Sequence, residues 1–157
     1  MKCLVIGNGG REHALAAALD RAASVTQVYG TSPNAGMATV CEALLLSPTD
    51  IEGITAAVER LDIDLTVVGP EAPLVAGLAD RLRAAGRAVL GPSAAAAQIE
   101  GSKTFAKALM DEAGIPTAAW ARFTDSEAAI AWQRAQGTPF VVKADGLAAG
   151  KGVIVPE

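Results

Sequence analysis

Residues 7–15 (GNGGREHAL) combine glycines with a neighbouring cation and carboxylate. They separate a short apolar run from an alanine- and leucine-rich stretch, which is where dinucleotide-binding folds place a phosphate loop. Gly9 and Gly10 would let backbone N–H groups approach an anion, and Arg11 with Glu12 suits a ligand that carries anionic and hydroxyl or amine groups. A tight turn that opens a helix with a glutamate is the alternative. NAD is disfavoured, because Glu12 stands where G-x-G-x-x-G requires its third glycine and no acidic residue closes the second predicted strand.

A second carboxylate follows a uniformly apolar segment in VGPEAPL, residues 68–74. Glu71 comes directly after that segment, and Pro70 and Pro73 stiffen the turn around it. In a parallel sheet this turn and the first glycine loop lie at the same edge and face one cleft. Glu71 is therefore a candidate for recognising a hydroxyl or an amine, and plain helix initiation is the alternative.

The second glycine-rich segment is GLAAGKG, residues 146–152. It fails the Walker A pattern twice, because Asp145 stands at the first glycine and Gly152 stands at the serine or threonine. Apolar residues typical of a strand follow it. We therefore expect a glycine flap between two strands, with Lys143 before it and Lys151 within it, that folds over the phosphates of a nucleotide. A hairpin without a ligand is the alternative.

The remaining reactive residues indicate no catalytic set. His13 is the only histidine, so a two-histidine metal site cannot be built within this chain. Its place near a predicted helix start favours a structural role, and contact with a ligand beside Arg11 is the alternative. Cys3 and Cys41 lack C-x-x-C spacing and are expected to be small buried apolar residues.

These residues must be positioned by alternating strands and helices. Over about the first hundred residues this order predicts right-handed crossovers and an α/β fold with a doubly wound parallel sheet. Thr49 and Glu52 have the spacing of a capping box at the start of the second helix. The expected strands cover residues 2–7, 26–29, 65–69 and 89–90, and the expected helices cover 12–23, 50–61 and 73–86.

After the alanine run at 94–97 the pattern changes. Ser102 can cap a helix over 103–113, and Asp125 or Ser126 can cap another that ends near Gly137. The candidate strands are residues 120–123, 140–143 and 153–155. Since the sequence stops just after its richest loop, this second domain is expected to be incomplete.

Composition bounds the classes of function. The chain has 157 residues, 51% hydrophobic and 19% charged, so disorder is excluded. A net charge of -4 gives no basic footprint for nucleic acid. Only two cysteines, and neither a signal-peptide core nor a membrane-length apolar run, lead us to expect a cytoplasmic protein without a membrane partner.

Six blocks follow one another along the chain: GNGGREHAL at 7–15, NAG at 34–36, VGPEAPL at 68–74, LGPS at 90–93, EGSK at 100–103 and VVKADGLAAGKGV at 141–153. Together they resemble the phosphoribosylamine–glycine ligase family of the ATP-grasp superfamily. The resemblance covers essentially the whole chain, and it implies a Rossmann-like, pre-ATP-grasp N-terminal domain over residues 1–101. Residues 102–157 resemble the incomplete start of an ATP-grasp domain. The family usually has Pro-Gly where Ser32 and Pro33 stand.

The resemblance implies a reaction in which ATP phosphorylates the carboxylate of glycine. The amine of 5-phosphoribosylamine then attacks the glycyl phosphate, which yields glycinamide ribonucleotide, ADP and phosphate, with Mg²⁺ or Mn²⁺ bridging the phosphates. The family's metal ligands are expected beyond Glu157, so the 157-residue chain alone is expected to be inactive and to hold no catalytic residue. Another ATP-grasp ligase, or a non-catalytic fragment that binds nucleotide or phosphosugar, is the alternative.

By position, the resemblance also implies site residues. The residues matched to the phosphoribosyl substrate are Gly9, Gly10, Arg11, Glu12, Asn34, Gly36, Pro70 and Glu71. Those matched to ATP are Lys103, Lys143, Gly146, Leu147, Ala148, Ala149, Gly150, Lys151 and Gly152.

Overall fold

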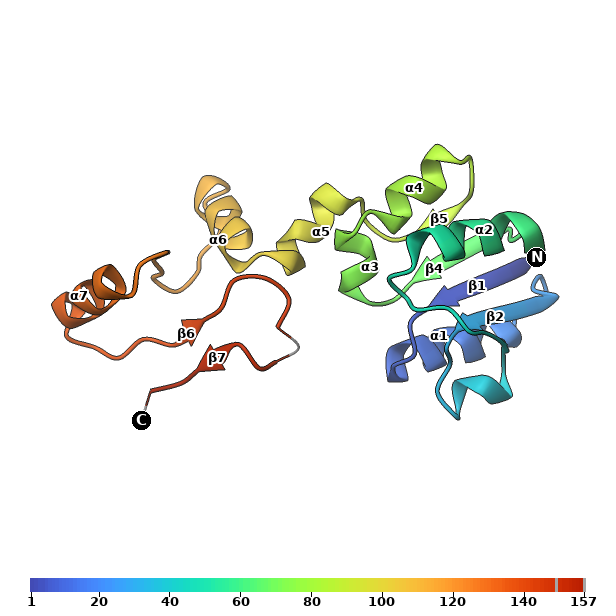
Figure 1. The fold of residues 1–157 in the computed structure, drawn as a ribbon, viewed down its shortest axis with the longest axis horizontal. Helices are drawn as coiled ribbons and strands as arrows, with labels where there is room; N and C mark the ends of the chain where they lie inside the picture. The colour runs from blue at the N-terminus through green and yellow to red at the C-terminus, as the bar shows by residue number, and fades with distance from the viewer. Residues whose placement is uncertain (149, 157) are drawn as a thin grey trace. The chain divides into compact units, whose positions relative to one another are not determined.

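The computed structural model describes residues 1–148 and 150–156 (Figure 1). Backbone contacts divide the chain into two compact units, Met1–Ala97 and Gln98–Glu157. Helix α5 (Ala94–Gly101) runs across this division. No helix within the described residues has both the length and the apolar character needed to cross a membrane.

The first unit is built on a five-stranded sheet in the order β3-β2-β1-β4-β5, with every neighbouring pair parallel. This confirms the α/β fold and the parallel sheet expected from the sequence. The strands are β1 (Lys2–Ile6), β2 (Gln27–Thr31), β3 (Glu42–Leu44), β4 (Leu65–Val68) and β5 (Val89–Leu90). The helices are α1 (Gly10–Asp20), α2 (Ile51–Leu61), α3 (Glu71–Val75) and α4 (Leu78–Ala84), with a 3₁₀ turn, η1 (Met37–Thr39).

Both faces of the sheet are covered, which explains the uniformly apolar strands. Leu4 and Ile6 of β1 pack in one core cluster with residues of α2 and α4, whereas Val5 packs in a second cluster with Ala16 of α1. Alternate residues of one strand therefore supply two cores. In Figure 1, α1 lies on the opposite side of β1 from α2 and α4.

Three details of the first unit differ from the sequence predictions. The single helix predicted over 73–86 is two helices, because the chain turns at Gly77 with φ of +92°. Helix α2 is capped not by Thr49 but by Asp50, whose Oδ1 accepts from the Gly53 N–H at 2.9 Å. Strand β3 was not predicted, although the apolar residues 43–46 overlap it; it is an edge strand of only three residues.

The cysteines lie apart and are free. Cys3 is fully buried in β1, and Cys41 is partly buried against the second core cluster. Burial raises the pKa of both thiols, which keeps them protonated and unreactive at neutral pH.

The second unit contains α6 (Lys103–Glu112), α7 (Ser126–Gln136) and an antiparallel pair, β6 (Val142–Lys143) with β7 (Val153–Ile154). Ser102 caps α6 and Asp125 caps α7, as the sequence predicts. The strand predicted over 120–123 is wrong: this segment is irregular, and the indole N–H of Trp120 donates to Asp111 Oδ2 at 2.8 Å. Neither α6 nor α7 contains a buried residue.

The two units should differ in local stability. Among the described residues, the buried core clusters lie in the first unit. We therefore expect limited trypsin digestion of the 157-residue chain to cut α6 and α7 well before it cuts β1 or α2. Hydrogen exchange followed by mass spectrometry checks this with the same chain. Equal protection of α7 and α2 would contradict it.

Candidate functional site

Parallel pairing of β1 with β4 brings two chemically important loops together. Ile6 lies opposite Val68 in the register, and the Gly69 N–H donates to the Ile6 carbonyl at 3.1 Å. The chain therefore leaves both strands at the same edge of the sheet, as the sequence predicts. Pro70 lies directly against Gly7, whose φ is +108° and whose N–H donates to the buried Thr31 hydroxyl at 2.8 Å.

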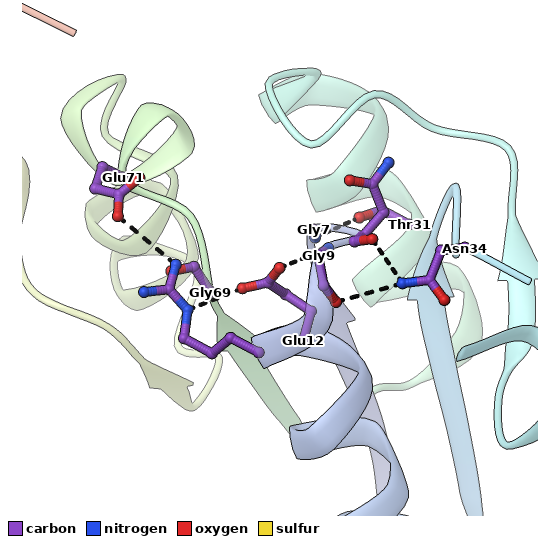
Figure 2. A network of polar contacts seen from close by, with 9 residues as sticks. Gly7, Gly9, Glu12, Thr31, Asn34, Gly69 and Glu71 are labelled. Atoms are coloured by element: carbon purple, nitrogen blue, oxygen red, sulfur yellow. Dashed lines mark hydrogen bonds and ion pairs between the residues drawn. The ribbon is translucent and has the colours of Figure 1, made fainter. Parts of the chain in front are cut away.

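A carboxylate and a guanidinium join these two loops (Figure 2). Glu12 Oε2 accepts from the Gly9 N–H at 2.7 Å, and Glu12 Oε1 accepts from Arg11 Nε at 3.0 Å. Arg11 Nη2 donates to the Gly69 carbonyl and lies 3.6 Å from Glu71 Oε1. The hydrogen bond to Glu12 is the main reason that the pKa of Arg11 is raised. Arg11 is thus the link between the first glycine loop and the Glu71 turn.

Asn34 ties a third loop to the same edge. Its Nδ2 donates to the Asn8 carbonyl at 2.7 Å, and its Oδ1 accepts from the Met37 N–H at 2.9 Å. Gly36 lies against the imidazole of His13, since a Cβ there would be 2.7 Å from His13 Cε1. The structure thus gathers Asn34 and Gly36 near the first glycine loop, with His13 packed against Gly36.

Ser32 and Pro33 lie directly after β2, at the start of the same loop. Ser32 takes φ of +40°, a conformation that proline cannot adopt. Its N–H donates to the Leu44 carbonyl at 2.8 Å, and its hydroxyl donates to the Leu46 carbonyl at 2.9 Å. Ser32 therefore fixes this loop to the end of β3 and to the segment that follows it.

A cavity of about 490 Å³ lies beside Arg11, at the ends of β4 and β5. Arg83 also lines it and donates to the Gly91 carbonyl. Sequence reasoning missed Arg83, because an arginine in a predicted amphipathic helix has the pattern of an ordinary solvated residue. Gly69 lines this cavity, but Pro70, the next residue, does not.

In the second unit, Asp145 anchors the glycine-rich segment to the start of α6. Its Oδ1 accepts from the Thr104 N–H at 3.2 Å and from the Gly146 N–H at 3.0 Å, and its Oδ2 accepts from the Ser102 hydroxyl at 3.1 Å. Lys103 Nζ donates to the Gly146 carbonyl at 2.7 Å. Sequence reasoning used Asp145 only as a mismatch to a pattern, and the one signal for its role was Ser102 as a helix cap.

The glycine-rich segment is the loop of a β-hairpin, as predicted. Lys143 pairs with Val153, and the Ala144 N–H donates to the Gly152 carbonyl at 2.7 Å. The Lys151 N–H donates to the Ala148 carbonyl at 2.8 Å, which folds the loop back on itself. Leu147 and Gly150 lie within this loop, and Ala149 lies outside the described residues.

The acidic residues do not converge on a metal site. Within residues 1–148 and 150–156, no group of three or more histidine, cysteine, aspartate or glutamate side chains could hold a metal ion. Asp145 is engaged by N–H and hydroxyl donors.

A parallel sheet and a lysine-flanked glycine hairpin fit the ATP-grasp class of proteins, and two family models match the chain. A family model described as "Phosphoribosylglycinamide synthetase, N domain" matches residues 1–100. A second, described as "Phosphoribosylglycinamide synthetase, ATP-grasp (A) domain", matches residues 101–157. The chain belongs to the phosphoribosylglycinamide synthetase family.

Known relatives extend well past the matched region. The phosphoribosylamine–glycine ligase of Xanthomonas axonopodis pv. citri is 54% identical over 157 residues, which are 99% of this chain and 36% of the relative. The crystal structure of the Thermotoga maritima ligase superposes with a TM-score of 0.75 at 27% identity, over 99% of this chain and 36% of that one. The biotin carboxylase domain of Hydrogenobacter thermophilus 2-oxoglutarate carboxylase shares the fold, with a TM-score of 0.78 at 20% identity over 98% of this chain and 37% of that one. The chain thus spans about a third of the length of the curated relatives it matches.

The contacts of Asp145 predict its titration. Hydrogen bonds, chiefly from the Thr104 N–H, lower its pKa from 3.8 to about 2. Because the folded pKa is depressed, the anchor contributes stability above pH 3.8 and loses it as the pH falls through about 2. We expect a carbon-13 NMR titration of the Asp145 carboxyl to have its midpoint near 2, and Ser102→Ala to raise that midpoint.

A short peptide of residues 143–147 is the control, and its Asp145 side-chain carboxyl should titrate at about pH 3.9. The same midpoint in peptide and folded chain would mean that Asp145 does not hold the hairpin to α6.

Proposed function

We propose that this chain is the front part of a phosphoribosylamine–glycine ligase. Such an enzyme uses ATP to join glycine to 5-phosphoribosylamine through glycyl phosphate, and so serves purine synthesis. The observation that carries the proposal is the pair of family matches that follow one another along the chain, residues 1–100 and 101–157. The relatives named as this ligase support it.

For the phosphoribosyl substrate we propose the edge of the first sheet. Arg11 offers an accessible guanidinium for the phosphate, and Glu71 offers an accessible carboxylate for a hydroxyl or the amine; their side chains are 60% and 45% exposed. Gly9 and Gly10 begin α1, where the partial positive charge of a helix favours an anion. Asn34, Gly36 and Pro70 shape the surrounding loops.

For ATP we propose the hairpin of the second unit. Lys103 and Lys143 would contact the nucleotide, and the loop residues Gly146 to Gly152, with Lys151, would cover its phosphates. Gly146 and Gly150 both have positive φ, a backbone conformation that glycine adopts readily and that lets the loop turn sharply. Mg²⁺ or Mn²⁺ would neutralise charge on the phosphates when it is bound.

The division of labour follows from this assignment. We place the N-terminal domain at residues 1–101 and the start of the ATP-grasp domain at 102–157, and the change of contacts after Ala97 supports this boundary. Each half would position one phosphorylated substrate, so the protein's work is alignment and charge neutralisation. The 157-residue chain alone is not expected to complete the reaction, and the alternative is a fragment that only binds nucleotide or phosphosugar.

The test uses the complete polypeptide made from the natural gene, after its intact mass and reading frame have been determined. We expect ADP release that requires both glycine and 5-phosphoribosylamine, with glycinamide ribonucleotide as the product. Lys143→Met should lower kcat/KM for ATP by on the order of 100-fold, because a charge on the transferring phosphate loses its partner.

Lys107→Met is the matched control. Lys107 lies on α6, as Lys103 does, but its ammonium group contacts the Ala118 carbonyl and the Thr117 hydroxyl. It should therefore retain activity. ADP release without glycine, or glycinamide ribonucleotide made by the 157-residue chain itself, would contradict this assignment.

A further inference from the structure

Glu12 is the enclosed member of the charged group at the first sheet edge. Its side chain is 6% exposed, whereas the side chains of Arg11 and Glu71 are 60% and 45% exposed. Both of its oxygens already accept hydrogen bonds, from the Gly9 N–H at 2.7 Å and from Arg11 Nε at 3.0 Å. A ligand that arrives from solvent can reach Arg11 and Glu71, but it finds Glu12 already engaged with the protein.

The space around Glu12 exists because three neighbouring positions lack side chains. A Cβ at Gly9 would lie 2.6 Å from Glu12 Oε2, and one at Gly7 would lie 2.8 Å from Glu12 Cγ. A Cβ at Gly69, in the loop after β4, would overlap the carboxylate itself. In contrast, a Cβ at Gly10 would meet no atom within 4 Å. The loop is therefore closed around Glu12 and open in front of the first residue of α1.

This arrangement exceeds an ordinary capping box, in which a glutamate in the first turn accepts only from the N–H at the start of its own helix. Here the second carboxylate oxygen holds Arg11, and Arg11 in turn donates to the Gly69 carbonyl. The guanidinium is thus fixed through Nε and Nη2, and Nη2 also lies 3.6 Å from Glu71 Oε1. Glu12 therefore orients the Arg11 guanidinium, which in turn contacts the loop after β4.

We propose that Glu12 is a positioning residue: from inside the loop it fixes the Gly9 backbone and the Arg11 guanidinium in the arrangement that receives a phosphorylated amino sugar. The inference rests on the proposed function for the identity of that substrate. It assigns substrate contact to Arg11 and Glu71, and it gives Glu12 no direct contact. The expected signature is a selective loss of affinity for the phosphosugar, since ATP and glycine do not depend on this edge.

The test is Glu12→Gln in the complete polypeptide. Glutamine keeps the size of the side chain but offers one acceptor oxygen to two donors, so either Gly9 or Arg11 loses its partner. We expect KM for 5-phosphoribosylamine to rise by about tenfold or more, with KM for ATP and for glycine within about twofold of the starting protein. Glu12→Asp, which keeps the charge, should recover part of the loss.

A second variant displaces the carboxylate without changing its charge. Gly69→Ala puts a methyl group where Glu12 lies, so it should give the same selective rise in KM. Glu59→Gln, an exposed glutamate on α2, is the matched control and should leave every KM unchanged. If Glu12→Gln fails to fold, Gly69→Ala and Glu12→Asp decide the matter.

If the starting protein is active, either of two results would overturn the proposal. One is no selective change in any of these variants. The other is an equal loss for all three substrates that follows a fall in Tm, which would mark Glu12 as a purely structural residue. If the starting protein makes no glycinamide ribonucleotide, the proposed function fails, and ribose 5-phosphate then serves as the probe.

Calorimetry would support the proposal if Glu12→Gln weakens the binding of ribose 5-phosphate by about tenfold. Equal binding of ribose 5-phosphate by the starting protein and the variant would overturn it.

Discussion

The parallel register between β1 and β4 is the constraint on which the first site depends. Ile6 pairs with Val68, so Gly7 and Gly69 leave the sheet together and Arg11 can reach across. A shift of one residue would turn the buried side chains of β1 toward the wrong core cluster, and a shift of two would separate the loops by roughly 6–7 Å. Burial on both faces therefore fixes the geometry of the polar groups at the edge.

The sequence was most informative where structure is local. Apolar runs locate β1 and β4, and Ser102 and Asp125 mark the starts of α6 and α7 because a helix cap acts within three residues of its position. Glycines between apolar segments predict loops at strand ends. From such signals the α/β fold, the first glycine loop and the hairpin of the second unit could all be expected.

What the sequence could not supply is the partner of each polar side chain. Glu12 has the same pattern whether its carboxylate faces solvent or lies within the loop, and only the proximity of Gly69, far away in the chain, decides between them. Asp145 likewise needs Thr104, a residue 41 positions earlier, to reveal its role. Contacts of this kind depend on tertiary structure, which leaves no periodic signal in the chain.

Both glycine loops solve one physical problem in the same way. Glycine gives a loop freedom to approach a ligand but no side chain with which to hold its own shape, and that freedom costs entropy when the loop is ordered. In each unit a carboxylate accepts from a backbone N–H of the loop, Glu12 from Gly9 and Asp145 from Gly146. A neighbouring cation also donates to a backbone carbonyl: Arg11 to Gly69, in the loop after β4, and Lys103 to Gly146. Under the proposed function, these contacts arrange the remaining donors before a phosphate arrives, so less ordering is left for the ligand to bring about.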